Sequence, residues 1–303
     1  MAPAATMRGC AAHYNLDVLE LNADLHCHST VSDGTLSPAQ LAQRAKDNGV
    51  TLWSLTDHDE VAGQRGAAAA ARAAGLDYVS GVEISVTFAG QTIHVVGLGI
   101  NPDDAALCAG LVDTRNGRAR RARAIGDSLA AVGIDGALEG AQALAGNPDM
   151  VTRTHFARWL VATGVCRDTH DVFRRYLVRG KPGYVPQQWA TLRDAVRWIV
   201  DAGGIAVIAH PARYKVSANE ESALFDEFQS YGGRSVEVQT ASHGEAEVTK
   251  YGALAKARGL LASRGSDFHA PGESRVELGA LPALPGGLMP VWSELQPRIV
   301  RAA

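Results

Sequence analysis

The sequence predicts an α/β protein in which side chains of metal-ligand type follow the strands of a closed or nearly closed barrel. Short apolar runs alternate with helical patterns over residues 23–99, and the alternation returns after about residue 191. Histidine and aspartate residues stand at or directly after several of these runs. Strand–helix repetition implies parallel strands with helical crossovers. We therefore expect the ligands at the C-terminal ends of the strands, where the catalytic face of an α/β barrel lies.

The first part of the barrel begins with a short strand at residues 23–25. Ser37 and Pro38 then start a helix, because serine is a favourable N-cap and proline fits the first helical position. An Ala-rich helix is expected at residues 61–74. Further strands are expected at residues 51–55, 78–79 and 93–98.

The second part of the barrel repeats this pattern. Helices are expected at residues 192–202 and 246–258, and strands at 205–209, 235–238 and 260–263. The segment between the two parts is mostly helical, with helices at residues 113–132, 151–163 and 169–177. We interpret it as an insertion over the barrel mouth.

These elements predict four regions along the chain. They are an N-terminal extension (residues 1–21), the first part of the barrel (22–100), a helical insertion that serves as a substrate-binding cap (101–188) and the second part of the barrel (189–303).

Composition narrows the class of protein. Apolar residues make up 46% and charged residues 20% of the 303 residues, as in a globular enzyme with a sizeable core. The net charge of -3 does not suggest a protein that coats nucleic acid. Four cysteines without C-x-x-C spacing fit reduced thiols. Neither a signal peptide nor a membrane-spanning stretch is visible, so we expect a cytoplasmic protein without a membrane partner.

A pair of histidines, His26 and His28, opens a series of potential metal ligands. Side chains alternate along a strand, so both imidazoles share a face while Cys27 points to the core. An ordinary histidine pair without metal is the alternative for this motif alone. Four further motifs favour metal: S-D-G at 32–34, T-D-H-D at 56–59, A-H-P at 209–211 and S-D-F-H at 266–269. The full candidate set is His26, His28, Asp33, His58, Glu83, His94, His210, Asp267 and His269.

These motifs resemble the PHP family, named for polymerase and histidinol phosphatase, over about residues 22–99 and 191–279. The resemblance implies a distorted (β/α)7-type barrel and three divalent ions. The first ion would be held by His26, His28, Glu83 and Asp267, the second by Glu83, His94 and His210, and the third by Asp33, His58 and His269. Manganese is the metal we expect first. Iron and zinc are alternatives, because nitrogen and oxygen ligands without thiolate suit all three.

Such a centre favours a phosphate substrate. Three divalent ions carry six positive charges against three carboxylates, and they can polarise phosphoryl oxygens and activate a water as hydroxide, the expected nucleophile. Asp57 and Asp59 flank His58, and we expect either to orient that ring or to protonate the leaving oxygen. The alternative is that both are turn residues that cap the next helix.

The predicted insertion supplies basic and aromatic residues that could hold a second anionic group. The candidates for substrate binding are Arg153, His155, Lys181, Tyr184 and, from the second part of the barrel, His243. We interpret Arg158 and Arg179 as solvated charges. A run of arginines, Arg115, Arg118, Arg120, Arg121 and Arg123, is interpreted first as a solvated helix face and second as a patch that steers RNA.

The segments V-E-V-Q-T-A-S-H-G at 236–244 and S-R-G-S-D-F-H-A-P-G at 263–272 resemble one branch of the PHP family. This branch comprises nucleoside 3′,5′-bisphosphate phosphatases and 5′→3′ exoribonucleases of short RNA. The resemblance implies a phosphoesterase that removes a 3′-phosphate from such nucleotides, or nucleotides from 5′-phosphorylated RNA, and no obligate protein partner is evident. The rival hypotheses are a histidinol-phosphate phosphatase and a non-catalytic nucleic-acid-binding or polymerase-accessory module.

Overall fold

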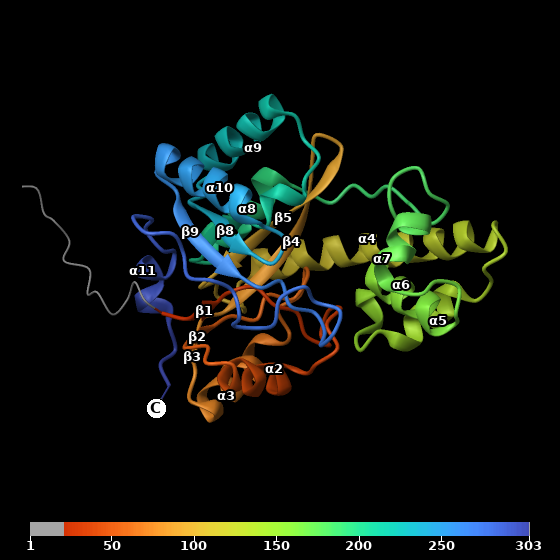
Figure 1. Cartoon of the computed structure of the whole chain (residues 1–303), viewed down its shortest axis with the longest axis horizontal. Helices are drawn as coiled ribbons and strands as arrows, with labels where there is room; N and C mark the ends of the chain where they lie inside the picture. The colour runs from red at the N-terminus through yellow and green to blue at the C-terminus, as the bar shows by residue number, and fades with distance from the viewer. Residues whose placement is uncertain (1–20, 303) are drawn as a thin grey trace, which may run out of the picture.

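The computed structural model describes residues 21–302, which form a mixed α/β fold with two sheets (Figure 1). One sheet has three parallel strands in the order β1-β2-β3, and the other has six in the order β6-β4-β5-β7-β8-β9. The strands are β1 Ala23–Asp24, β2 Leu52–Trp53, β3 Asp77–Tyr78, β4 Gly81–Phe88, β5 Gln91–Leu98, β6 Ala190–Thr191, β7 Ile205–Ile208, β8 Ser235–Thr240 and β9 Leu261–Gly265. The expected N-terminal extension lies outside the described residues except for its last position.

The two sheets adjoin at two places through isolated backbone bridges. Glu83 in β4 pairs with His58, which follows β2, and Phe268 after β9 pairs with Cys27 after β1. The amide of His28 also donates to the carbonyl of Phe268 at 2.8 Å. The strand ends that carry the predicted ligands are thereby brought together. Within residues 21–302 the strands form two sheets rather than one continuous closed barrel.

The expectation of parallel strands throughout is wrong around β4 and β5. These two strands run antiparallel, and β5 is also antiparallel to β7. The cause is local. Ala89 and Gly90 have φ angles of 46° and 70°, and two consecutive residues with positive φ are what a two-residue hairpin turn requires. An Ala-Gly pair is not a usual turn signal, so the strands expected at residues 78–79 and 93–98 included neither β4 nor the hairpin.

The helices outside residues 101–188 cover the two sheets (Figure 1). They are α2 Pro38–Asp47, α3 Gln64–Ala74, α8 Leu192–Asp201, α9 Ala218–Ser230, α10 Glu245–Arg258 and α11 Trp292–Leu295. The predicted start of α2 is confirmed, because Ser37 and Gln40 form a reciprocal capping box. Cys27 is buried with residues of α2 and α3, as the strand alternation predicted. No helix within residues 21–302 is long and apolar enough to cross a membrane.

Between β5 and β6 the chain forms a group of helices that we call the cap. It consists of α4 Ala105–Ala130, α5 Ala137–Leu144, α6 Arg153–Ala162, α7 Thr169–Val172 and a π-helical turn at Phe173–Leu177. Figure 1 shows α4 running from the sheets into the group of α5, α6 and α7.

One helix, α4, belongs to two hydrophobic cores. Leu107 and Leu111 pack in the core of the six-stranded sheet, whereas Ile125 and Leu129 pack in the separate core of the cap. Gly110 lets α4 approach α8 closely, since a Cβ at this position would lie 2.4 Å from the Trp198 ring. A single continuous helix therefore fixes the position of the cap relative to the sheets.

Candidate metal centre

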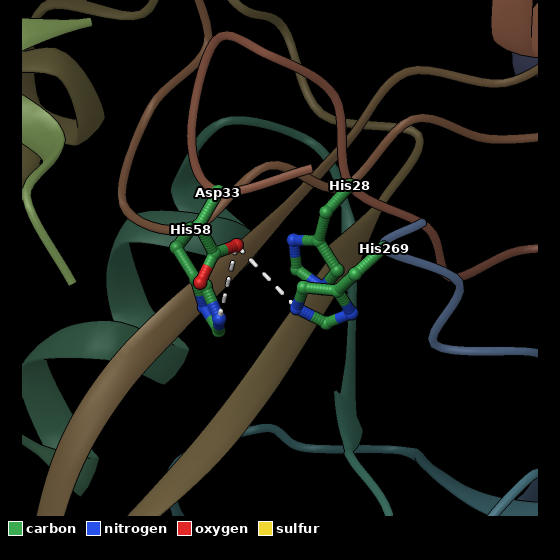
Figure 2. Close-up of side chains that lie close together, drawn as sticks. All are labelled: His28, Asp33, His58 and His269. Carbon is green, nitrogen blue, oxygen red and sulfur yellow. Dashed lines mark ion pairs between the residues drawn. The ribbon is translucent and has the colours of Figure 1, made fainter. Parts of the chain in front are cut away.

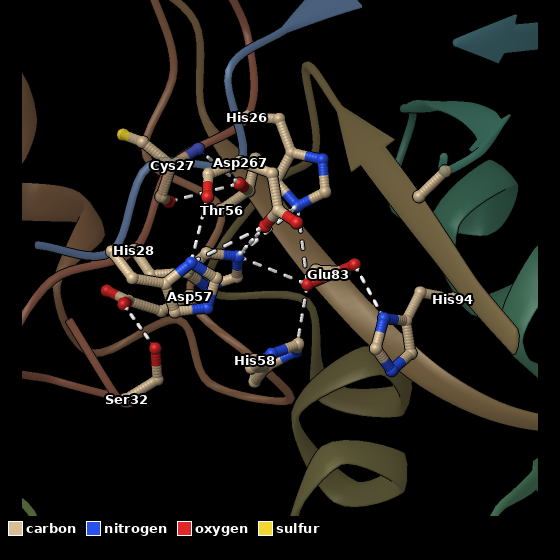
Figure 3. Close-up of polar contacts among 12 residues, drawn as sticks. His26, Cys27, His28, Ser32, Thr56, Asp57, His58, Glu83, His94 and Asp267 are labelled. Carbon is tan, nitrogen blue, oxygen red and sulfur yellow. Dashed lines mark hydrogen bonds and ion pairs between the residues drawn. The ribbon is translucent and has the colours of Figure 1, made fainter. Parts of the chain in front are cut away.

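The Glu83 carboxylate lies in the middle of the candidate site (Figure 3). It is fully buried on β4, among rings that other strands supply. Its Oε2 atom lies 2.8 Å from His58 Nδ1 and 3.2 Å from His28 Nε2. Its Oε1 atom lies 2.8 Å from His94 Nδ1 and 3.0 Å from His210 Nε2. One carboxylate thus faces ligand-type nitrogens with both oxygens, as a bridging ligand would.

Two more carboxylates complete the cluster. Asp267 Oδ1 lies 3.2 Å from His28 Nε2 and 3.5 Å from His26 Nε2. Asp33 Oδ1 lies 3.4 Å from His269 Nε2, and Figure 2 shows this aspartate pointing toward the imidazoles. All nine candidate ligands therefore lie in one region, although they come from positions that are far apart in the chain.

Three sets of donor atoms within this region are close enough to share an ion, with all atoms of a set within 4.8 Å of one another. The sets are His26, His28, Glu83 and Asp267; His28, Asp33, His58 and His269; and His58, Glu83 and His94. The first set equals the group that the family resemblance implies for the first ion. The second set contains Asp33, His58 and His269, the group implied for the third ion, together with His28. The group implied for the second ion is also close together, because His94 Nδ1 and His210 Nε2 lie 3.4 Å apart and 2.8 Å and 3.0 Å from Glu83 Oε1.

The chemistry of these donors fits divalent cations. Asp33 Oδ1 and Glu83 Oε2 are buried and accept no hydrogen bond among the described residues, although ring nitrogens lie close to both. A buried carboxylate oxygen without a hydrogen bond is costly unless a cation neutralises it. Burial alone would raise the pKa of Glu83, but the nearby imidazoles of His94 and His58 hold this pKa well below its usual range. The Glu83 carboxylate is therefore ionised, as a ligand to a positive ion must be.

Glu237 contacts the candidate ligands, although it is not in the set expected from the sequence. It is buried, and its Oε1 atom lies 2.7 Å from His26 Nδ1, while Oε2 accepts a hydrogen bond of 2.6 Å from the backbone amide of His210. A carboxylate on one imidazole nitrogen fixes the tautomer and leaves the other nitrogen free for a metal. Glu237 therefore orients one candidate ligand and the backbone of another. The available signal was an acidic residue inside the apolar strand segment V-E-V.

Three residues at the centre have a left-handed backbone. The φ angles are 47° at Asp59, 28° at His210 and 53° at Asp267. For residues other than glycine such conformations cost of order 1–3 kcal/mol, and they are frequent at functional sites. Backbone hydrogen bonds hold them: the amide of Asp267 donates to His26 at 2.8 Å, and that of Asp59 donates to Glu83 at 2.8 Å.

The carboxylates of Asp57 and Asp59, expected to be catalytic, are both occupied by other groups. Asp57 accepts hydrogen bonds of 2.6–2.7 Å from Ser29 N, Ser29 Oγ and Ser32 Oγ, the last visible in Figure 3. Asp59 accepts from the amide of Ser85 at 2.7 Å and forms an ion pair with Arg118. Both aspartates are fully buried. These contacts favour positioning roles over transfer of a proton.

A pocket whose lining includes the carboxylate cluster is also lined by arginines of the cap. Arg118 and Arg121 are buried, and their guanidinium carbons lie 4.9 Å and 5.4 Å from the centre of the Trp189 ring. Arg153 lines the same pocket. Burial and the neighbouring Arg153 lower the pKa of Arg121 to about 9. We call this cavity the arginine pocket.

The expectation that the arginine run forms a solvated helix face is wrong for Arg118 and Arg121. Residues three apart on a helix share a face, and Arg118 and Arg121 turn that face toward Trp189. Arg120 and Arg123 are exposed, as expected, and Arg115 is partly buried. Arg158 was also wrongly expected to be solvated, because it donates to the carbonyl of Asp33 at 2.6 Å and pairs with Glu273, whereas Arg179 is exposed.

The other expected substrate-binding residues lie in different settings. His155 is buried, accepts a hydrogen bond from the Thr152 amide at 3.0 Å and does not line the arginine pocket. Burial lowers its pKa to about 4, so its ring is neutral at pH 7. Lys181 is exposed and Tyr184 partly buried, and neither lines the pocket. His243 is buried, with its ring nitrogens near backbone groups of Val238 and Ala212.

Comparison with known proteins gives relatives that cover nearly the whole chain. The chain is 49% identical over 282 residues to a 3′,5′-nucleoside bisphosphate phosphatase of Chromobacterium violaceum, which covers 93% of this chain and 99% of the relative. It is 42% identical over 271 residues to the 5′-3′ exoribonuclease Rnm of Escherichia coli, and the match covers 89% of this chain and 92% of the relative.

A solved structure is similar over the same extent. It is an amidohydrolase from Chromobacterium violaceum with bound sulfate and no metal, and it matches with a TM-score of 0.91 and 49% identity over 93% of this chain and 98% of that chain. A family model described as the PHP domain matches residues 24–204. By these matches the chain belongs to the PHP domain family.

Proposed function

We propose that the protein is a metal-dependent phosphoesterase that hydrolyses the 3′-phosphoester of nucleotides carrying a 5′-phosphate. Two substrates share this chemistry. A nucleoside 3′,5′-bisphosphate loses its 3′-phosphate, and short 5′-phosphorylated RNA loses its first nucleotide. The observation that carries the proposal is that arginines of the cap and a cluster of metal-ligand side chains line the same pocket. The names of the two curated relatives agree with these activities.

The nine clustered side chains would hold three divalent ions, with manganese expected first. Such ions supply polarisation of the phosphoryl oxygens and a hydroxide at neutral pH. The protein keeps the ligands in place through buried hydrogen bonds, of which the pair between Glu237 and His26 is the shortest to a candidate ligand ring. The surrounding burial excludes bulk water and strengthens the attraction between the ligands and a cation.

The arginine pocket would hold the 5′-phosphate. Asp59 neutralises Arg118, but Arg121 and Arg153 have no carboxylate partner within residues 21–302. Arg121 is buried and Arg153 is partly buried. Two guanidinium groups without counter-ions match a phosphate dianion in charge and in hydrogen-bonding geometry. A 5′-phosphate bound by these arginines would place the 3′-phosphoester at the ligand cluster. The site would therefore select nucleotides that carry both groups.

We further propose that the two sheets act as one distorted barrel, with its first part at residues 22–100 and its second at 189–303. The cap, at residues 101–188, would be the substrate-binding insertion. In this arrangement Asp57 holds the loop of Ser29 and Ser32, and Asp59 holds Arg118. Both aspartates then serve substrate positioning rather than protonation of the leaving oxygen.

Kinetics on the metal-loaded protein test this function. Phosphate release from adenosine 3′,5′-bisphosphate should exceed release from histidinol phosphate by more than tenfold in kcat/KM. Preference for histidinol phosphate would favour that rival activity. Binding of RNA without release of phosphate or nucleotide would instead favour the non-catalytic module. His28→Ala should abolish turnover with little change in far-UV circular dichroism, because it removes a ligand shared by two of the three donor sets.

A further inference from the structure

A second cavity, of about 410 Å³, adjoins the arginine pocket, which measures about 110 Å³. The two cavities share Thr154, Phe173, Arg213, Asp267 and His269 as lining residues. Because Asp267 and His269 are candidate metal ligands, the carboxylate and imidazole cluster stands at the junction of both. A volume of this size is in the range of cavities that bind small organic molecules. We call it the downstream cavity.

Several side chains that line the downstream cavity have the character of a single-strand nucleic-acid site. Arg275 is exposed and has no ion-pair partner among the described residues, and the exposed His170 on α7 lines the same cavity. The Oγ atom of Ser242 is buried yet makes no hydrogen bond in the described structure. Phe173 adds an aromatic wall. Cationic, aromatic and hydroxyl groups together suit a nucleotide, whose phosphate, base and sugar each need one of them.

The chemistry of a phosphodiester requires room at this junction. In a bisphosphonucleotide the scissile phosphorus carries three terminal oxygens. In RNA the O5′ atom of the next nucleotide replaces one of them. Hydrolysis adds a water-derived hydroxyl to phosphorus and breaks the bond to O3′, which leaves with the electron pair and takes up the proton. The second nucleotide stays on the phosphorus, so an enzyme that accepts RNA must hold this nucleotide next to the metal ligands.

The balance of charge favours the same arrangement. A bisphosphonucleotide has two phosphates, and the ligand cluster and the arginine pocket account for both. No anion of such a substrate remains for Arg275 and His170. A third phosphate, which links the second and third nucleotides of an RNA chain, would reach the downstream cavity. We infer that the downstream cavity binds the nucleotide that follows the scissile phosphodiester of 5′-phosphorylated RNA, with Arg275 and His170 contacting the next phosphate and base. This inference rests on the proposed function.

The test compares one short RNA with one mononucleotide on the same proteins. The substrates are the trinucleotide pApApA and adenosine 3′,5′-bisphosphate, and the proteins are manganese-loaded wild type, Arg275→Ala and His170→Ala. Arg179→Ala is the matched control, since Arg179 is exposed in the cap and lines neither cavity. Each of the first two substitutions should lower kcat/KM for pApApA about tenfold and change it less than twofold for the bisphosphate. Arg275→Ala should also make the salt dependence with pApApA shallower by about 0.7 in log–log slope.

Each other outcome has a distinct meaning. Equal losses on both substrates would show that the cavity holds the base of the first nucleotide, and no loss on either would show that it holds no part of the substrate. Both results overturn the inference and leave the proposed function standing. A wild-type protein that hydrolyses the bisphosphate but not pApApA also overturns it. Inactivity on both substrates would refute the proposed function, and the inference with it.

Discussion

Replacement of Arg121 by alanine should separate binding of the 5′-phosphate from hydrolysis. The guanidinium is buried on α4, its Nε donates to the carbonyl of Val185 at 2.9 Å, and no carboxylate in residues 21–302 pairs with it. Burial and the nearby Arg153 lower its pKa to about 9, which leaves it charged at pH 7. An incoming phosphate would relieve this uncompensated charge, so the substitution removes an attraction that only a 5′-phosphorylated substrate uses.

The expected loss can be estimated from the contacts that remain. Arg153 stays in the pocket, and Asp59 continues to neutralise Arg118. One charge-assisted hydrogen-bonding group is therefore lost, which amounts to about 1.5–3 kcal/mol. This corresponds to a decrease of about 10- to 150-fold in kcat/KM. Adenosine 3′-monophosphate lacks the 5′-phosphate, and its kcat/KM should change less than twofold.

Phosphate release from adenosine 3′,5′-bisphosphate and from adenosine 3′-monophosphate, measured side by side, provides the assay. Arg120→Ala is the control, because Arg120 neighbours Arg121 on the same helix but is exposed. It should leave both substrates unaffected. If Arg121→Ala slows both substrates to the same extent, or neither, the assignment of the 5′-phosphate to the arginine pocket is refuted.

Three further experiments test the structure. Glu237→Gln should weaken metal binding about 10- to 100-fold in a chelator competition. Glutamine has one acceptor oxygen, so it cannot accept hydrogen bonds from both His26 and the His210 amide as the two carboxylate oxygens do. Unchanged affinity would contradict the orienting role of Glu237. Removal of metal by chelation should lower the thermal midpoint by roughly 5 °C, and reloading should restore it, since an ion at a hundredfold its Kd stabilises by about 2.7 kcal/mol. Gly90→Ala should destabilise by about 1 kcal/mol in urea unfolding because φ is 70°, whereas Gly66→Ala in α3, with open space around its Cβ, should stabilise by about 0.5–1 kcal/mol; the same sign for both would refute the hairpin argument.

The sequence predicted those parts of the fold that local patterns determine. The start of α2 at Ser37 and Pro38 follows from capping chemistry that operates within a few residues. The antiparallel β4–β5 hairpin was missed because Ala89 lacks the usual turn preference for glycine or asparagine and adopts a positive φ through its context. Helices α5 and α9 were also missed.

For the site, the sequence was most informative where several ligand types recur within short motifs. It was least informative where one side chain acts on another from a distant strand. Glu237 looks like a single acidic residue in a buried strand, and its contact to His26 joins residues 211 positions apart. Arg118 and Arg121 were expected to be solvated, because the sequence of their own helix does not indicate a contact with Trp189. This residue lies against them in the structure but comes much later in the chain.

The ion pair between Asp59 and Arg118 links the two halves of the proposed active site. Asp59 directly follows the candidate ligand His58, and its carboxylate also accepts from the amide of Ser85, two residues after Glu83. Arg118 lies one helical turn before Arg121 on α4 and also donates to Ser85 Oγ at 2.8 Å. The metal ligands and the arginine pocket are therefore joined through buried, hydrogen-bonded contacts rather than through a mobile loop. A fixed separation of this kind would favour substrates in which the 5′-phosphate and the 3′-phosphoester lie at a matching distance. Both groups, at the same spacing, are present in the bisphosphonucleotide and in the first nucleotide of 5′-phosphorylated RNA.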